Sequence, residues 1–321
     1  MAKKKILFIV NPISGTGSKL SVYRDIRRYV SAEKFDISIC HTKYAGHASK
    51  LAHQAVKEGV DIVAAVGGDG TVNEVARALV RTETALGIVP CGSGNGLARH
   101  LHIPMNTVRA LSIINEAEIC DLDHGVIDGR PFFCTCGTGF DAFVSMKFAA
   151  GGKRGPKTYL ENVLKGWLKY KPEVYTIENE DGTLQMRAFL IACANASQYG
   201  NNAYIAPHAS MEDGLMDVIL MEPFNALEAP VIAAQLFTKQ LPGNSHIKTF
   251  RARKIIIHRS EDGIAHCDGD PIETKKDITV EMMPHSFKVV VNASDDTMGV
   301  RNLMQWISDD ITHWWERNIK R

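Results

Sequence analysis

The sequence lacks any run of about 20 apolar residues, the length that a membrane-spanning helix needs. Its first apolar segment, 6–10, follows a basic start at 1–5 and is too short for the core of a signal peptide. The chain of 321 residues also lacks excess charge, because its formal net charge is only +1. No global field therefore attracts nucleic acid or an anionic membrane, and any such attraction must come from a local patch. We expect a cytoplasmic protein without a nucleic-acid partner.

The sequence also lacks the usual signals of a metal clamp, of disulfides and of disorder. Its twelve histidines show no metal-binding spacing, and its seven cysteines are scattered and odd in number. Most of these cysteines lie in apolar segments, so we expect reduced, buried thiols. There is no internal repeat, no long linker and no low-complexity tract. With 45% hydrophobic and 23% charged residues, the chain is typical of a globular protein with room for two domains.

The first part of the chain alternates strand-like and helix-like patterns. Short apolar or alternating runs predict strands, and helical spacing with capping residues predicts the helices between them. We expect strands at 6–10, 35–41, 61–66 and 85–89, and helices at 18–30, 46–58, 71–80 (with Thr71 as the N-cap) and 106–117. This order predicts an α/β domain with a parallel sheet and helices on both of its faces.

From about Asp123 onward, short β-branched segments separated by turn residues predominate. We expect strands at 174–178, 189–193, 216–220, 254–258, 264–267, 278–282 and 287–291. Short strands at this spacing predict an antiparallel sandwich or barrel. Helices are expected at 156–170 and 301–321. The basic clusters at 151–157 and 251–254 are expected to be solvated.

The strongest functional signal is the segment 66–74, which reads Val-Gly-Gly-Asp-Gly-Thr-Val-Asn-Glu. It follows a predicted strand and opens a predicted helix, so backbone N–H groups and the helix dipole would favour a phosphate. Its glycines let the backbone approach that phosphate closely. Asp69 places a carboxylate in this anion site, which suits Mg²⁺ bound directly or through water. The alternative is a glycine-rich turn in which Thr71 only caps the helix.

Two further glycine-containing turns, 11–17 and 90–96, also follow predicted strands. In a parallel sheet, such turns lie at the carboxyl ends of the strands, where ligands bind. Each of them alone could be a tight strand-to-helix turn. The chain has no Gly-x-x-x-x-Gly-Lys-Ser/Thr motif and no dinucleotide fingerprint after its first strand. The three turns together therefore predict a phosphate site of another design.

The three turns occur in the order Asn-Pro-x-Ser-Gly, Gly-Gly-Asp-Gly-Thr-x-Asn-Glu and Pro-x-Gly-Ser-Gly-Asn-x-Leu-Ala. In this order and spacing they resemble the diacylglycerol kinase catalytic-domain family, which includes bacterial diacylglycerol kinases, related lipid kinases and sphingosine kinases. The resemblance covers nearly the whole chain. It implies an α/β nucleotide-binding domain at 1–122 plus 293–321, where the last helix returns to it, and a β-rich lipid-substrate domain at 123–292. The active site would lie in the cleft between them.

The resemblance also implies which residues bind the nucleotide and its metal ion. ATP would bind to Asn11, Pro12, Ile13, Ser14, Gly15, Thr42, Gly67, Gly68, Asp69, Gly70, Thr71, Val72, Asn73 and Ser93. Mg²⁺ would be held by Asp213 with backbone carbonyls of Ser210 and Leu215, a set of hard oxygen ligands. An ordinary Asp-Gly turn that enters a strand is the alternative for Asp213.

The catalytic base implied by the resemblance is Asp268, in the segment Cys-Asp-Gly-Asp at 267–270. The family has Glu at the last of these positions, where this chain has Asp270, and the shorter side chain could weaken a supporting contact. A free aspartate, with a pKa of ~3.9, is a weak base toward an alcohol. Phosphoryl transfer tolerates this because its transition state is loose and proton removal can come late. A hairpin turn is the alternative for Asp268 and Gly269.

The sequence thus predicts an ATP- and Mg²⁺-dependent lipid kinase of phospholipid metabolism that associates peripherally with a membrane. Diacylglycerol or a related glycerolipid is the first candidate acceptor. A sphingoid base is the second, because the turn at 92–96 looks more like that of sphingosine-type kinases. NAD kinase, which shares Gly-Gly-Asp-Gly-Thr, and a non-catalytic lipid- or nucleotide-binding regulator remain as alternatives. A homodimer is left open.

Overall fold

The structure is a computed structural model, and it describes residues 3–15, 19–150, 166 and 170–292. The described chain forms two compact units. The first comprises residues up to His124 together with 284–292, and the second comprises residues 125–283. The sequence placed these divisions at 122/123 and 292/293. The predicted helix at 301–321, the return of 293–321 to the first domain, and the helix at 156–170 apart from positions 166 and 170 lie outside the described residues.

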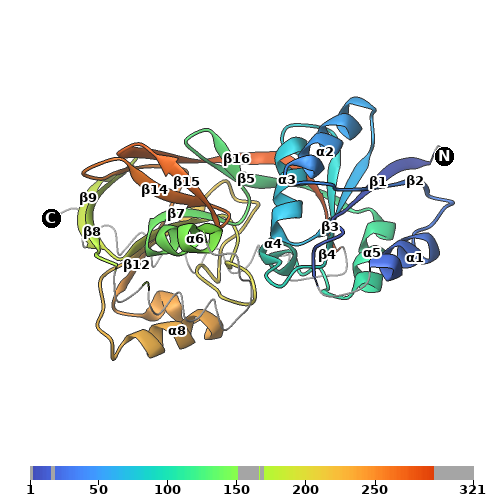
Figure 1. The fold of residues 1–321 in the computed structure, drawn as a ribbon. Helices are drawn as coiled ribbons and strands as arrows, with labels where there is room; N and C mark the ends of the chain where they lie inside the picture. The colour runs from blue at the N-terminus through green and yellow to red at the C-terminus, as the bar shows by residue number, and fades with distance from the viewer. Residues whose placement is uncertain (1–2, 16–18, 151–165, 167–169, 293–321) are drawn as a thin grey trace. The chain divides into compact units, whose positions relative to one another are not determined.

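The first unit is a parallel sheet with helices. The strand order is β2-β1-β3-β4, and the end of β16 lies beside β4. Both β3 and β4 are buried along their whole length and form the centre of the core. The elements (Figure 1) are β1 (Lys4–Val10), α1 (Lys19–Tyr29), β2 (Phe35–His41), α2 (His47–Lys57), β3 (Ile62–Gly67), α3 (Asp69–Leu79), β4 (Ala85–Pro90), α4 (Gly96–His100) and α5 (Thr107–Glu116).

The start of α3 differs from the prediction. The helix begins at Asp69 and its N-cap is Gly68, so Thr71 lies in the first turn and is not the cap. The hydroxyl group that was expected to cap the helix instead accepts a hydrogen bond from the side chain of Asn11. The sequence also gave no sign of α4, because this five-residue helix depends on Asn95, which adopts the left-handed conformation just before it.

The second unit contains two antiparallel sheets. One joins β16 (Asp277–Val290), β13 (Lys254–His258), β8 (Glu173–Asn179) and β9 (Gly182–Ala188), with β5 (Ile119–Ile127) and β6 (Arg130–Phe132) beside β16. The other has the order β12 (Ile247–Ala252), β11 (Met216–Met221), β10 (Leu190–Ala194), β7 (Thr135–Gly139), β14 (Gly263–Cys267) and β15 (Asp270–Thr274). The chain crosses between the units within β5 and β16.

The hydrophobic core of the second unit lies between its two sheets. Tyr175 and Ile257 from one sheet belong to the same buried cluster as Ile191 and Val218 from the other. A second cluster covers the opposite face of the β12–β15 sheet with side chains of α6 (Phe140–Ala150) and α8 (Ala229–Thr238), and the short helix η1 (Leu241–Gly243) joins it through Leu241. This is the sandwich that the short strands predicted. Among the described helices, none is long and apolar enough to cross a membrane.

The two strands predicted at 278–282 and 287–291 are a single strand, β16. The intervening Pro-His-Ser looked like a turn, and His285 does adopt a positive φ of 45°. The strand nevertheless continues, and the N–H of His285 donates to Asp123 Oδ1 at 2.8 Å. A buried carboxylate on β5 therefore satisfies the backbone group that the irregularity turns away from the ladder.

Candidate functional site

The turn after β1 is tied to the start of α3 through Asn11. Its backbone N–H donates to Val66 O at 2.9 Å, and its Nδ2 donates to Thr71 Oγ1 at 3.0 Å. The side-chain Oδ1 accepts the N–H of Ile13 at 3.1 Å, which closes the turn on itself. The first and second predicted nucleotide-binding turns are therefore neighbours in the folded unit.

The N-terminus of α3 presents backbone donors. The N–H groups of Thr71 and Val72 donate to Gly68 O at 3.0 and 3.1 Å. Within the described chain, no acceptor is recorded for the N–H groups of Asp69 and Gly70. A Cβ added to Gly70 would meet nothing within 4 Å, so the space beside the Cα of Gly70 is open. Exposed amide donors and the positive end of the helix dipole together make this end of α3 suited to an anion.

Asp69 joins the second turn to the third. Its Oδ2 accepts the N–H of Asn95 at 2.8 Å, and its Oδ1 accepts the N–H of Gly96 at 2.7 Å. The carboxylate therefore caps α4 in place of a side chain from the turn itself. We expected Asp69 to hold Mg²⁺ directly or through water. Each of its oxygens accepts one backbone N–H, and metal binding by Asp69 stays a prediction. Its role in the structure is to hold two turns together.

The second and third turns also touch through their backbones. A Cβ added to Gly92 would lie 2.7 Å from the Cα of Gly68, which is closer than real Cβ contacts come. The side chain of Asn95 closes the third turn, because its Oδ1 accepts the N–H of Gly92 at 3.0 Å and its Nδ2 donates to Gly92 O at 2.7 Å. All three glycine-containing turns thus form one connected group at the carboxyl end of the sheet.

The other residues predicted to bind ATP lie around this group. The N–H of Thr42, just after β2, donates to Val10 O at 2.9 Å, so Thr42 is beside the first turn. Ser93 is exposed, whereas Val72 and Asn73 are buried. Sequence reasoning missed the part played by Glu74, whose two oxygens accept the N–H groups of Gly46 and Ala48 at 2.8 and 3.0 Å and so cap α2.

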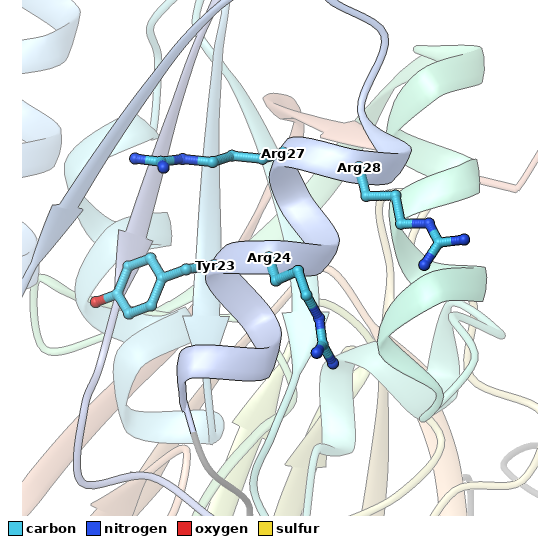
Figure 2. Close-up of a pocket in the computed structure, with 4 residues that line it drawn as sticks. All are labelled: Tyr23, Arg24, Arg27 and Arg28. Carbon is cyan, nitrogen blue, oxygen red and sulfur yellow. The ribbon is translucent and has the colours of Figure 1, made fainter.

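A separate feature of the first unit is a basic face on α1. Arg24, Arg27 and Arg28 are exposed and, with Tyr23, line a surface hollow of about 470 Å³ (Figure 2). Among the described residues, their single ion pair is that of Arg24 with Asp25, at 4.0 Å. Like charges three and four residues apart on a helix repel one another. Within the described residues, this face therefore carries more positive than negative charge, in a chain whose net charge is only +1.

The predicted metal ligand Asp213 lies in the second unit and forms an ion pair with Arg251. Its other oxygen, Oδ1, accepts the N–H of Leu215 at 3.0 Å. Arg251 was expected to be solvated, and this is wrong, because its side chain is only 16% exposed. Asp217 lies nearby, with Oδ1 at 4.0 Å from Arg251 Nε. Burial raises the pKa of Asp217 to about 6, against the attraction of Arg251.

This arrangement bears on whether Asp213 can hold a metal ion. Both of its oxygens are engaged, one of them by a guanidinium group that already neutralises the carboxylate. In the part of the chain that the structure describes, no three His, Cys, Asp or Glu side chains gather as metal ligands do. A Mg²⁺ ion at Ser210, Asp213 and Leu215 would compete with Arg251 for the carboxylate of Asp213. Binding there stays a prediction, and we derive no chemical step from it.

Asp268 lies in the two-residue connection between β14 and β15. Both Asp268 and Gly269 have positive φ, 52° and 84°, as a type I′ hairpin turn requires. Asp268 and Gly269 therefore do form a hairpin turn, and the carboxylate of Asp268 also accepts hydrogen bonds from a neighbouring segment. Its Oδ1 accepts N–H groups of Cys134 and Thr135 at 2.7 and 3.1 Å, and its Oδ2 accepts that of Phe133 at 2.9 Å. Three backbone donors thus fix this carboxylate in one orientation.

Comparison with known proteins adds to this geometry. Residues 5–127 match the model of the diacylglycerol kinase catalytic domain, and residues 134–291 match that of the YegS C-terminal NAD kinase beta sandwich-like domain. A protein of Chromohalobacter salexigens named probable lipid kinase YegS-like is 31% identical over 222 residues, which cover 67% of this chain and 71% of that protein. A diacylglycerol kinase of Bacillus subtilis is 26% identical over 282 residues, which cover 83% of this chain and 90% of that protein.

This chain belongs to the diacylglycerol kinase catalytic-domain family. A crystal structure of a diacylglycerol kinase from Bacillus anthracis str. Sterne has the same fold, with a TM-score of 0.72 and 22% identity over 91% of this chain and 98% of that one. The expected family and the expected combination of a parallel α/β unit with an antiparallel sandwich are confirmed. The expected enzyme class, a lipid kinase, agrees with the names of these relatives.

Proposed function

We propose that this protein transfers the γ-phosphoryl group of ATP to a hydroxyl group of a membrane lipid, with diacylglycerol or a related glycerolipid as the first candidate. The enzyme class follows from membership of the family, whose members include proteins named diacylglycerol kinase in several bacteria. The observation that carries the proposal is the joining of three predicted turns into one group by Asn11, Asp69 and Asn95. A sphingoid base remains the second candidate acceptor.

The geometry of the first unit supports a polyphosphate at the start of α3. The N–H groups of Asp69 and Gly70 are available as donors, and the space beside the Cα of Gly70 is open. A glycine backbone can approach phosphate oxygens more closely than other residues allow. We propose that ATP enters as its magnesium complex, in which the metal belongs to the nucleotide and neutralises its charge. No ligand role is assigned to Asp69.

In the second unit, Asp268 is the proposed partner of the lipid hydroxyl group. Three amide donors hold its carboxylate in one orientation, in which it can accept a hydrogen bond from an alcohol. Such a carboxylate is a weak base, which phosphoryl transfer tolerates because positioning and charge neutralisation provide most of the rate. Asp270, which replaces the family's Glu, is exposed.

A lipid acceptor implies contact with a bilayer, and we propose that the basic face of α1 provides it. Val22 and Ile26 bury the opposite face of this helix in the core of the unit, which leaves Arg24, Arg27 and Arg28 pointing outward. Arginines flanked by tyrosines suit the headgroup region of an anionic membrane, where the ring and the guanidinium group each find a polar and an apolar neighbour. The protein would then be peripheral.

The proposal is tested with ATP labelled on the γ-phosphate and diacylglycerol in nonionic detergent micelles. The wild type is expected to form a labelled phospholipid. Asp268→Asn is expected to lower kcat by roughly 10²–10⁴-fold with ATP affinity retained. Because the new amide would face three N–H donors, unfolding by urea must be measured beside it. The matched control is Asp181→Asn, in the exposed β8–β9 turn. Turnover of Asp268→Asn equal to that of the wild type would exclude this role.

A further inference from the structure

His266 and Asp141 form a buried pair directly behind the Asp268 turn. His266 Nε2 lies 3.0 Å from Asp141 Oδ2, and the two side chains are only 2% and 11% exposed. The hydroxyl group of Tyr199 donates to the same Oδ2 at 3.3 Å. On the other edge of the ring, Nδ1 accepts the backbone N–H of Gly269 at 3.4 Å. The imidazole ring thus bridges a carboxylate and the backbone of the turn.

The folded chain makes room for this pair. Ala265 and Cys267 belong to the sandwich core, so His266 between them points to the opposite face of β14. Helix α6 packs on β14. Its partner across the β7–β14 ladder is Gly137. A Cβ at Gly137 would lie 3.2 Å from Asp141 Oδ2 and 2.2 Å from Ile191 O, so only glycine fits there. Asp141 itself stands in the first turn of α6, where the helix dipole stabilises a carboxylate.

The two contacts of the His266 ring indicate which of its nitrogens carries the proton. Nδ1 can accept from Gly269 only when it carries no proton, and Nε2 must then carry the proton that it donates to Asp141. The carboxylate selects this tautomer, as it does in other carboxylate–histidine pairs. The N–H of Gly269 cannot be satisfied by the two-residue turn itself, so the ring supplies the missing acceptor.

We propose that Asp141 and His266 are positioning residues that hold the Asp268 turn, and with it the carboxylate, in the orientation required for phosphoryl transfer. The turn is clamped on two sides: His266 holds its backbone at Gly269, and the N–H groups of residues 133–135 hold its side chain. The inference rests on the proposed role of Asp268. A displacement of a reacting group by about 1 Å can cost on the order of 100-fold in rate.

Two substitutions separate the contacts of the ring. The amide oxygen of His266→Asn occupies the position of Nδ1 and can still accept from Gly269, but it does not reach Asp141. The amide nitrogen of His266→Gln occupies the position of Nε2 and can still donate to Asp141, but it leaves Gly269 without an acceptor. If His266 only fills the buried space and pairs with Asp141, His266→Gln should keep more kcat than His266→Asn. If His266 positions the turn, His266→Asn should keep more kcat than His266→Gln.

The experiment measures kcat on micellar diacylglycerol, KM for ATP, and hydrogen exchange of the peptide that contains Gly269. We expect His266→Gln to lower kcat by about 10- to 100-fold with KM for ATP unchanged, and to speed exchange at Gly269. His266→Asn should stay within a few-fold of the wild type in kcat and in the rate of hydrogen exchange at Gly269. His258→Gln, on β13 and with two carboxylate partners of its own, is the matched control and should leave kcat unchanged.

The proposal is overturned if His266→Gln retains as much kcat as His266→Asn, or if either variant changes KM for ATP instead of kcat. Should His266→Gln not fold, Asp141→Asn replaces it; a several-fold loss of kcat supports the inference, and an unchanged kcat overturns it. A wild type that phosphorylates no lipid would refute the proposed function. Hydrogen exchange at Gly269 would still show whether His266 holds the turn.

Discussion

The carboxylate of Asp69 accepts the backbone N–H of Gly96 at 2.7 Å, across 27 positions of sequence. With its second bond to the N–H of Asn95, it joins the start of α3 to the start of α4. An aspartate that was expected to bind a metal ion therefore also braces two turns. Together with Asn11 and Asn95, this side chain holds the backbone donors around the proposed nucleotide.

Substitution of Asp69 by Asn should therefore disrupt the site through its backbone. The amide can accept one of the two N–H groups but presents its own N–H to the other, which leaves a partly buried donor unsatisfied. We expect a loss of about 1–3 kcal/mol in the free energy of unfolding and a weaker affinity for ATP. Urea unfolding and calorimetric titration measure the two effects. Asp36→Asn, at an exposed position of β2, is the control. Equal stability and equal ATP affinity in the two variants would contradict the claim that Asp69 braces the two turns.

Two glycine substitutions distinguish a ligand space from a packing contact. A methyl group at Gly70 meets nothing within 4 Å, whereas at Gly92 it meets the Cα of Gly68 at 2.7 Å. Gly70→Ala should keep the unfolding midpoint in urea but weaken ATP binding, because the methyl group occupies space proposed for phosphate. Gly92→Ala should lower both the affinity for ATP and the free energy of unfolding, the latter by about 1–3 kcal/mol. Unchanged ATP affinity in Gly70→Ala would move the nucleotide away from α3.

The basic face of α1 can be tested without catalysis. Replacing Arg24, Arg27 and Arg28 together by Gln removes about 3 kcal/mol of attraction to an anionic surface, which is on the order of 100-fold in binding. Sedimentation with phosphatidylcholine vesicles that do or do not contain phosphatidylglycerol measures it. The control removes the same charge from exposed positions elsewhere: Lys57, Arg253 and Lys276.

Three outcomes of the vesicle experiment matter. Loss of binding to anionic vesicles in the α1 variant alone supports docking through this helix. Equal loss in both triple variants indicates attraction by net charge and contradicts it. Retention of full binding by the α1 variant contradicts it as well. Activity in nonionic micelles should stay unchanged, since no anionic surface takes part there.

Asp217 should make the stability depend on pH in an unusual direction. Because burial raises its pKa to about 6, the folded protein holds a proton that the unfolded chain releases above about pH 4. Stability therefore falls as the pH rises from about 4 to 6. Asp217→Asn should be more stable than the wild type above this window, by roughly 1–3 kcal/mol, and the difference should vanish below it.

Urea unfolding over a range of pH checks this prediction. Asp262 provides a control of opposite sign, because its hydrogen bond to Lys275 lowers its pKa. Asp262→Asn should lose stability at neutral pH and regain it in acid. A stability difference for Asp217→Asn that is independent of pH would show that Asp217 is not the titrating group.

Local patterns in the sequence predicted the strands and most helices of the first unit. The glycines and prolines of the three turns act through neighbours in sequence, so the positions of the turns could be inferred. The hydrogen-bond partners of the turn residues could not be inferred. Asp69 meets Asn95 and Gly96 only in the folded sheet, and the sequence equally allowed a metal ligand. The hydroxyl group of Thr71 was expected to cap its own helix but serves Asn11 instead.

The second unit shows the same limit more strongly. The strand predicted at 264–267 contains His266, yet nothing indicated that Asp141, 125 positions away, would pair with it. Arg251 belongs to a basic cluster, and most such clusters are solvated. Only the pairing of β11 with β12 brings Arg251 to Asp213 and Asp217. The division of 278–291 into two strands failed because a proline and a histidine with positive φ can be accommodated when a partner such as Asp123 is available.

The most direct test incubates the protein with γ-labelled ATP, Mg²⁺ and a total lipid extract, and then identifies the labelled product by chromatography and mass spectrometry. The account predicts label in a phosphorylated lipid, first of all in the phosphomonoester of diacylglycerol, and none with Asp268→Asn. Label in NADP from added NAD but in no lipid would contradict it. So would ATP binding without transfer to any lipid.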